Sequence, residues 1–187
     1  DQQLSVMAGN YGFGRMMVNA GKSFSCGAEA SLRGKALNNN LAWALSYSYT
    51  HAQFKEYDDA EIVDGKPVNI SYKDKRVPFV PEHTMSAMAD YTFPIASTGL
   101  RDITIGANAH AQGKTYWDEA NTFSQKLYCV IGAHADANFG FATLSVWGRN
   151  LASTRYNTFA SLNNATRQYF AQRGNPFQMG IDVRLHF

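Results

Sequence analysis

The chain has 187 residues, and 17 Lys and Arg against 15 Asp and Glu leave a formal net charge of +2. This balance gives no general electrostatic attraction to nucleic acid. Charged residues make up 17% of the chain and aromatic residues 13%, whereas a soluble domain usually has about 25% charged residues. The composition excludes a disordered or collagen-like chain. No apolar run approaches the roughly 18 residues of a membrane-spanning helix.

Apolar residues alternate with other residues along the whole chain, and this period of two predicts eight β-strands. In the fifth strand, for example, Ile105 and Ala107 share one face while Asn108 and His110 share the other. No charged residue falls on any of the apolar faces. In chain order, the predicted strands are 4–8, 24–32, 41–49, 85–93, 103–111, 127–137, 142–148 and 177–187.

Two kinds of barrel have strands of this pattern. A soluble barrel places its apolar face inside, and an outer-membrane barrel places it outside against lipid. The polar faces favour the membrane barrel, because they carry mostly Ser, Thr, Gly and Asn instead of the Lys and Glu of a solvated sheet. Aromatic residues also gather near the strand ends, as in interfacial girdles; they are Tyr47, Tyr49, Tyr91, Phe93, Phe177 and Phe187.

The connections alternate in length. Short turns are predicted at 35–40, 94–100 and 138–140, and long loops at 9–23, 53–83, 112–126 and 151–175. Short turns at one rim and long loops at the other are typical of outer-membrane barrels. We therefore predict an all-β fold of about eight antiparallel, up-and-down transmembrane strands with the apolar face to lipid and the polar face to the lumen. Its location would be the outer membrane of a Gram-negative bacterium.

Several segments resemble the late barrel strands of TonB-dependent outer-membrane receptors, and their order and spacing match across essentially the whole chain. They are 21–29 with 47–54 (Tyr-Ser-Tyr-Thr-His-Ala-Gln-Phe), 76–83 (Arg-Val-Pro-Phe-Val-Pro-Glu-His), 147–151 (Trp-Gly-Arg-Asn-Leu) with Arg155 and Tyr156, and 173–176 (Arg-Gly-Asn-Pro) before a terminal strand ending at Phe187.

The resemblance implies a barrel of about 22 strands closed by an N-terminal plug. Residues 1–187 would be its C-terminal segment, without the plug, so that TonB is contacted only through the absent plug region of the parent protein. The implied function is import of a scarce nutrient (an iron chelate, a corrinoid or a glycan) by binding to extracellular loops and passage through the lumen. This chain would supply wall and loops, with no enzymatic chemistry, cofactor or metal of its own.

The N-terminus has no basic and apolar export signal, so we expect a mature product or a fragment. Two alternatives to the receptor remain. One is a self-contained eight-stranded outer-membrane barrel with a structural or adhesive role. The other is an outer-membrane hydrolase or acyltransferase that uses His110 and His134 on the polar face.

The loops at 112–126 and 151–175 contain the best candidates for ligand binding. Aromatic rings beside amides and Arg can stack on a sugar or a chelate and hydrogen-bond to it. The residues expected to bind ligand are Tyr116, Trp117, Tyr156, Arg167 and Tyr169. By resemblance, the terminal Phe187 is a signal that the barrel-assembly machinery reads.

Charged residues on the polar faces are expected to be ordinary wall residues. Pairing across a tight turn at 139–140 places Asp136 opposite Thr143 and His134 near Ser145, so these residues and His110 form no compact triad. Opposite charges on the wall are expected to pair with one another, or in a complete receptor to hydrogen-bond the plug or line the substrate route. They are Asp90, Arg149, Asp182 and Arg184, with His186 beside them. Cys26 and Cys129 fall on strands that are not neighbours, so we expect no disulfide bond.

Overall fold

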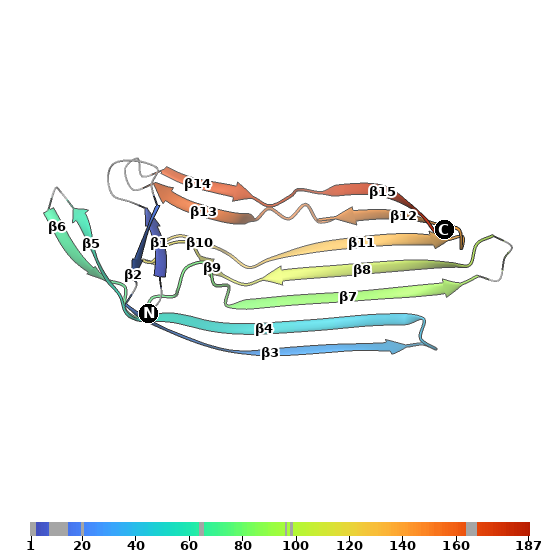
Figure 1. The fold of residues 1–187 in the computed structure, drawn as a ribbon, viewed down its shortest axis with the longest axis horizontal. Helices are drawn as coiled ribbons and strands as arrows, with labels where there is room; N and C mark the ends of the chain where they lie inside the picture. The colour runs from blue at the N-terminus through green and yellow to red at the C-terminus, as the bar shows by residue number, and fades with distance from the viewer. Residues whose placement is uncertain are drawn as a thin grey trace.

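The computed structural model describes residues 3–7, 15–19, 21–63, 66–95, 97, 99–163 and 168–187. In this part of the chain, seven long strands form one antiparallel sheet, ordered as they follow along the sequence (Figure 1). They are β3 (Lys22–Ala36), β4 (Leu41–Glu56), β7 (His83–Pro94), β8 (Asp102–Gln112), β11 (Tyr128–Asn138), β12 (Ala142–Arg149) and β15 (Gln178–Leu185). The predicted up-and-down order is confirmed for these strands. Within the described ranges, no helix has the length and apolarity that a membrane crossing requires.

Short hairpins lie at one end of this sheet, and the tight turns and the C-terminus lie at the other (Figure 1). We call these the loop end and the turn end. The hairpins pair β1 (Gln3–Met7) with β2 (Arg15–Asn19), β5 (Asp58–Val63) with β6 (Lys66–Ser71), β9 (Thr115–Tyr116) with β10 (Ser124–Gln125), and β13 (Asn157–Asn163) with β14 (Gln168–Arg173). The predicted asymmetry between long loops and short turns is therefore confirmed.

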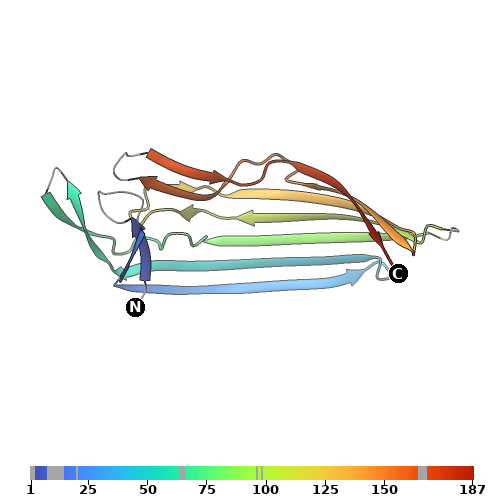
Figure 2. The same cartoon turned by 45° about the horizontal axis from the view of Figure 1, so that its top comes forward.

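The prediction of a first transmembrane strand at 4–8 is wrong. Residues in this region form β1, which pairs with β2 over five residue pairs in a hairpin separate from the main sheet. Five residues are too few, because a tilted strand needs about 9–11 residues to cross a bilayer. The main sheet curves but stays open, with β3 and β15 as its edges (Figure 2).

One face of the main sheet exposes large apolar side chains. Ile105 on β8 and Ile131 on β11 are 52% and 42% exposed, and Val146 on β12 is 49% exposed. The register pairs Ala135 with both Ile105 and Val146, so apolar residues lie side by side across three strands. A soluble monomer rarely exposes a continuous apolar surface of this kind. An outer-membrane barrel presents such a surface to lipid.

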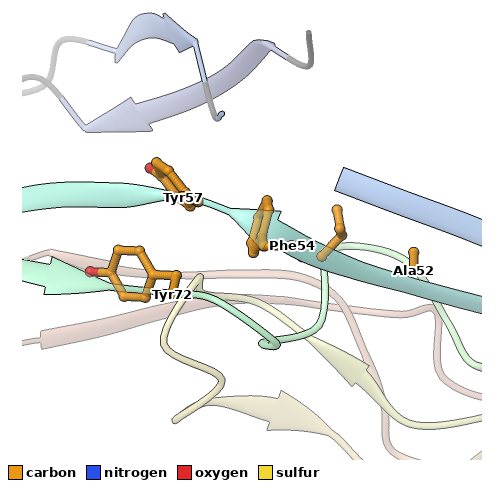
Figure 3. Close-up of a cluster of buried hydrophobic side chains, with 5 residues drawn as sticks. Ala52, Phe54, Tyr57 and Tyr72 are labelled. Atoms are coloured by element: carbon orange, nitrogen blue, oxygen red, sulfur yellow. The ribbon is translucent and has the colours of Figure 1, made fainter. Parts of the chain in front are cut away.

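The buried core of the described residues lies at the loop end, where the chain returns from β6 onto the end of β4. Phe54 is fully buried between Ala52 and Tyr57, and Tyr72 and Val77 complete the cluster (Figure 3). The ring of Tyr57 lies 5.0 Å from that of Phe54 and 5.2 Å from that of Tyr72. The backbone N–H of Tyr72 also donates to the carbonyl oxygen of Tyr57 at 2.8 Å.

This cluster makes the stability of the loop end depend on pH in the alkaline range. Burial, and then the negative charges of Asp59 and Glu119, raise the pKa of Tyr57 to about 12. In the unfolded chain a tyrosine ionises near pH 10, so between these values only the unfolded state loses the proton. Stability is therefore complete below pH 10 and falls as the pH rises to 12, by no more than about 3 kcal/mol.

We expect Tyr57→Phe to abolish this alkaline loss. The variant should also gain about 1 kcal/mol at neutral pH, because the buried hydroxyl has no hydrogen-bond partner among the described residues. Urea unfolding midpoints at pH 9 and pH 11 test both effects. An equal alkaline loss in the parent protein and the variant would contradict this role of Tyr57.

Candidate ligand-binding surface and lumenal wall

The loop between β8 and β11 is held in shape by the carboxylate of Asp118. One oxygen accepts hydrogen bonds from the N–H and hydroxyl of Thr122, at 3.0 and 2.6 Å, and the other accepts from the N–H of Phe123 at 2.8 Å. The N–H of Trp117 donates to the carbonyl oxygen of Phe123 at 2.9 Å. These bonds fix two aromatic residues at the base of the loop.

Asn121 joins this loop to the segment before β7. Its side-chain oxygen accepts the N–H of Arg76 at 2.7 Å, and its amide donates to the carbonyl oxygen of Arg76 at 2.9 Å. The guanidinium of Arg76 donates to Nδ1 of His51 on β4 at 2.9 Å and forms a salt bridge with Glu82. The 76–83 motif therefore links two loops to the strand beneath them.

Aromatic contacts bring the hairpin β13–β14 onto these two loops. Phe79 stacks on Phe159 with centroids 5.8 Å apart and an interplanar angle of 7°. Phe123 meets Tyr169 at 4.5 Å. Trp117 lies edge-on to Phe79 at 5.6 Å. Three connections that are distant in sequence thus share one aromatic surface at the loop end.

The predicted ligand residues lie in different parts of this surface. Tyr169 is 55% exposed on β14, whereas Trp117 is 8% exposed and its indole N–H has no acceptor among the described residues. Tyr156 stacks on Tyr128 at 4.4 Å. Arg167 lies outside the described residues. The structure thus gathers Trp117, Tyr156 and Tyr169 around the same loops.

Tyr116 lies on a different side of the chain. Thr115 is buried and accepts a hydrogen bond from the amide of Gln112, which is on the polar face of β8. Alternation within β9 then places Tyr116 on the opposite side of the strand from Thr115. The ammonium of Lys114 donates to the Tyr116 hydroxyl at 2.8 Å and lies 4.4 Å from the centre of its ring.

Two aromatic residues of the loop end, Phe79 and Tyr128, lie outside the two loops in which the sequence placed its ligand candidates. Phe79 lies in a segment with prolines at 78 and 81 and adopts φ = 64°, a backbone conformation that sequence patterns do not reveal for a phenylalanine. Tyr128 is the first residue of β11 and faces Gln112, to which its hydroxyl donates at 3.0 Å. The only sequence signal for Tyr128 is an aromatic residue at a strand end beside a candidate loop.

The polar face of the sheet contains a histidine between two carboxylates. Nε2 of His134 lies 3.8 Å from a carboxylate oxygen of Asp90 and 3.7 Å from one of Asp136. The register pairs Asp90 with Gly106 and Gly106 with His134. Because glycine has no side chain, the two flanking side chains meet across β8. His110 lies higher on the wall, opposite Ser86 and Val130.

The predicted residue pairing between β11 and β12, across the turn at 139–141, is wrong by two residues. Asp136 pairs with Ser145 and His134 with Trp147. The turn is longer than expected, because the N–H of Phe139 donates to the carbonyl oxygen of Ala142 and the Asn138 side chain accepts the N–H of Gly140 at 2.9 Å. An Asn side chain that bonds the backbone two residues ahead stabilises turns of this kind.

We expect Gly106→Ala to destabilise the sheet by about 1–3 kcal/mol. A Cβ atom at this position would lie 2.1 Å from Cε1 of His134 and 2.2 Å from a carboxylate oxygen of Asp90. The double variant Gly106→Ala with His134→Ala should recover part of the loss, since the imidazole is removed. Folding into lipid vesicles at increasing urea measures both, and an unaffected single variant would refute the close packing.

The charged side chains of β12 and β15 contact neutral side chains more often than side chains of opposite charge. Asp182 accepts the indole N–H of Trp147 at 2.8 Å. The guanidinium of Arg149 lies 4.7 Å from the centre of the Trp147 ring. His186 shares a hydrogen bond with the hydroxyl of Thr143 at 3.0 Å. The expectation that these charges pair with one another is therefore wrong for Asp182 and Arg149. Both cysteines are free, with β4, β7 and β8 between their strands.

Comparison with known proteins identifies the family to which this chain is similar. The family described as "TonB dependent receptor-like, beta-barrel" matches residues 1–151. The chain is 26% identical over 166 residues to the ferrichrome outer membrane transporter/phage receptor of Escherichia coli (strain K12), covering 83% of this chain and 21% of that protein. The chain thus spans about a fifth of the length of this curated relative.

Two solved structures share the fold. The ferric yersiniabactin uptake receptor of Yersinia pestis matches with a TM-score of 0.75 and 21% identity, over 92% of this chain and 25% of that one. The siderophore receptor of Acinetobacter baumannii matches with a TM-score of 0.70 and 23% identity, over 89% and 22%. With its membrane-facing strands and long loops at one end, the chain belongs to the family of TonB-dependent receptor β-barrels of the Gram-negative outer membrane.

Proposed function

We propose that this chain is the C-terminal segment of an outer-membrane receptor that imports a ferric siderophore. The named substrates of the relatives support an iron chelate: one relative is a ferrichrome transporter and another takes up ferric yersiniabactin. Of the three nutrient classes that the family resemblance implies, corrinoids and glycans have no such support. The open edges of the sheet favour a segment of a larger barrel over a self-contained one.

The observation that carries this proposal is the aromatic surface formed by three loops at one end of the wall. Phe79, Phe123, Phe159 and Tyr169 supply apolar faces that can contact a chelate. The Tyr128–Tyr156 stack belongs to the same connections, which are joined where the N–H of Asn157 donates to the side-chain oxygen of Gln125 at 2.9 Å. Aromatic rings with a few polar groups are typical of small-molecule sites. We include Tyr156 and Tyr169 among the ligand residues. Trp117 is buried and packs edge-on against Phe79, so we assign it to the support of this surface. We leave out Tyr116, whose ring and hydroxyl are covered by Lys114.

Quenching of intrinsic fluorescence in the full-length receptor tests this function. The probes are a ferric hydroxamate, a ferric catecholate, cobalamin and a maltooligosaccharide. We expect saturable binding of a ferric chelate, weakened up to about tenfold by Tyr156→Ala or Tyr169→Ala. Tyr91→Ala at the turn end is the matched control and should bind normally. Binding of cobalamin or the glycan alone, or equal weakening by all three variants, would overturn the proposal.

In the complete receptor, we propose, TonB acts through the plug region that lies outside residues 1–187, and the barrel-assembly machinery reads the last strand. Phe187 is fully exposed at the turn end. The N–H of His186 donates to the carbonyl oxygen of Phe141 at 2.8 Å and holds the preceding residue to the third turn. An accessible terminal aromatic side chain, next to a backbone that is held in place, suits recognition by an assembly factor.

Deletion of Phe187 should lower the amount of folded receptor at the cell surface far more than Phe177→Ala. Phe177 is the matched control, because it is an exposed aromatic at the other end of the same strand. Surface labelling of cells that express each variant gives the comparison. Similar surface levels would mean that Phe187 is one interfacial aromatic residue among several.

A further inference from the structure

The segment 75–77 lies between the end of β4 and the loop that joins β8 to β11. One edge of the segment pairs with β4, where the N–H of Phe54 donates to the carbonyl oxygen of Lys75 at 2.9 Å. The other edge is held by Asn121, whose side chain makes both of its bonds to the backbone of Arg76. A shift of this segment along β4 is therefore transmitted to the aromatic loop.

Alternation decides which side chains of this pairing meet. Val77 and Ala52 are buried in the core cluster, so Arg76 and His51 lie on the opposite side of the two chains, where both are half-buried. One guanidinium nitrogen of Arg76 donates to Nδ1 of His51 at 2.9 Å, and the other forms the salt bridge with Glu82. The guanidinium thus fixes the segment to β4 by its side chain as well as by its backbone.

The contact with Arg76 defines the protonation state of His51. A guanidinium donates hydrogen bonds and accepts none, so Nδ1 of the imidazole carries no proton. The proton is on Nε2, which donates to the side-chain oxygen of Gln53 at 2.9 Å. An imidazole gains its second proton in the range between pH 5 and 8. That proton removes the acceptor at Nδ1 and places a positive charge directly against the guanidinium.

The groups around His51 do not compensate for this second charge. Glu82 already pairs with Arg76, so a single carboxylate has to serve two adjacent cations once the imidazole is protonated. The described charged or titratable side chains on the elements that pack around His51 are Arg76 and Glu82 in the segment before β7, Cys26 opposite on β3, Tyr49 and Lys55 on β4, and His83 at the start of β7.

We propose that His51 is a positioning residue for the ligand-binding surface and that its protonation releases this surface. With a neutral imidazole, Arg76 is held on β4, and Asn121 extends this hold to the aromatic loop. In acid, the guanidinium leaves Nδ1, the segment 75–77 loosens, and the contact between Phe123 and Tyr169 weakens. Loss of a hydrogen bond to a charged group corresponds to about a tenfold change in the equilibrium between the held and released states. The effect on ligand affinity rests on the proposed function.

Hydrogen–deuterium exchange of the full-length receptor in detergent micelles measures the release. Mass spectrometry of peptides that span residues 73–80 reports exchange of the backbone N–H groups, and each rate is divided by the rate of an unstructured peptide at the same pH. In the parent protein, we expect the protection of this segment to fall about tenfold between pH 7.5 and pH 5.0.

Three variants separate protonation of His51 from other effects of acid. His51→Asn places an amide oxygen near the position of Nδ1, and this oxygen accepts from Arg76 but takes up no proton, so protection should stay high at both pH values. Arg76→Gln lacks the guanidinium and should be poorly protected at both. His83→Asn is the matched control: Nδ1 of His83 bonds to the hydroxyl of Tyr47 at 2.9 Å, which can donate or accept, so the acid release should persist.

Fluorescence quenching by a ferric hydroxamate on the same samples distinguishes this proposal from the proposed function. We expect binding to weaken about tenfold at pH 5.0 in the parent protein and to be independent of pH in His51→Asn. Equal protection of the parent protein at both pH values, or an acid loss that persists in His51→Asn, would overturn the role of His51. Acid release with pH-independent binding would overturn its coupling to the surface. Acid release without binding of any ferric chelate would support the release and contradict the proposed function.

Discussion

Replacement of Ala107 by Arg in the middle of β8 should cost about 2–4 kcal/mol in the free energy of folding into a bilayer. Ala107 pairs with Ala89 and Ala133 on the membrane-facing side, where a guanidinium would lie in hydrocarbon with no polar partner. Ile131→Arg on the neighbouring strand should cost a similar amount. Reversible folding into lipid vesicles over a urea series measures both variants.

The matched control for Ala107→Arg is Asn108→Arg, one residue further along β8. Its side chain projects from the polar face, so the added charge stays out of lipid and the cost should be small. Gly132 is unsuitable for this comparison, because a Cβ atom there would lie 2.9 Å from the Asn108 side chain and 3.2 Å from the Gly148 carbonyl oxygen. Equal losses for Ala107→Arg and Asn108→Arg would show that the two faces are assigned wrongly.

Asn150→Ala should destabilise the loop end by about 3 kcal/mol, since it removes three partly buried hydrogen bonds worth about 1 kcal/mol each. Asn150 is buried at the end of β12 with φ = 50°. Its amide donates to the carbonyl oxygens of Thr154 and Asn175 at 3.0 and 2.9 Å, and its side-chain oxygen accepts the N–H of Thr154 at 2.8 Å. It thereby ties the connection between β12 and β13 to the residues that precede β15.

Asn150→Gly separates the two causes of this loss. Glycine accepts the positive φ without strain, so this variant should be less destabilised than Asn150→Ala by about 1 kcal/mol. Both variants should weaken binding of the ferric chelate, because the hairpin that carries Tyr169 loses its anchor. Urea unfolding and fluorescence quenching on the same samples give the two results. A fully stable Asn150→Ala variant would refute the role of the amide.

The faces of the strands follow from sequence because membrane and lumen demand opposite chemistry at alternate residues. In β8 and β11, each residue that alternation assigns to lipid lies on the exposed apolar face, as Ile105 and Ile131 show. The position of the long loops follows equally well from their length. Segment 4–8 shows the limit of this reasoning, because five alternating residues also suit a short hairpin strand.

Contacts between distant segments do not follow from sequence. His134 meets Asp90 because the residue between them across β8 is glycine, and only the register reveals this. The aromatic surface depends on Asn121, which fixes one loop to the backbone of Arg76. In sequence these residues are 45 positions apart. Recognition of the 76–83 motif predicts the family but not the bonds that the motif makes.

The apolar face of the sheet is oriented outward, toward lipid, and spin labels along β8 in the intact outer membrane measure this orientation residue by residue. With Cys26 and Cys129 replaced by alanine, single labels are placed at Thr104, Ile105, Ala107, Asn108, Ala109 and His110. We predict that 105, 107 and 109 are relaxed by lipid-soluble oxygen, whereas 104, 108 and 110 are shielded from it. Accessibility without alternation, or with the opposite phase, would contradict the placement of this chain as the wall of an outer-membrane barrel.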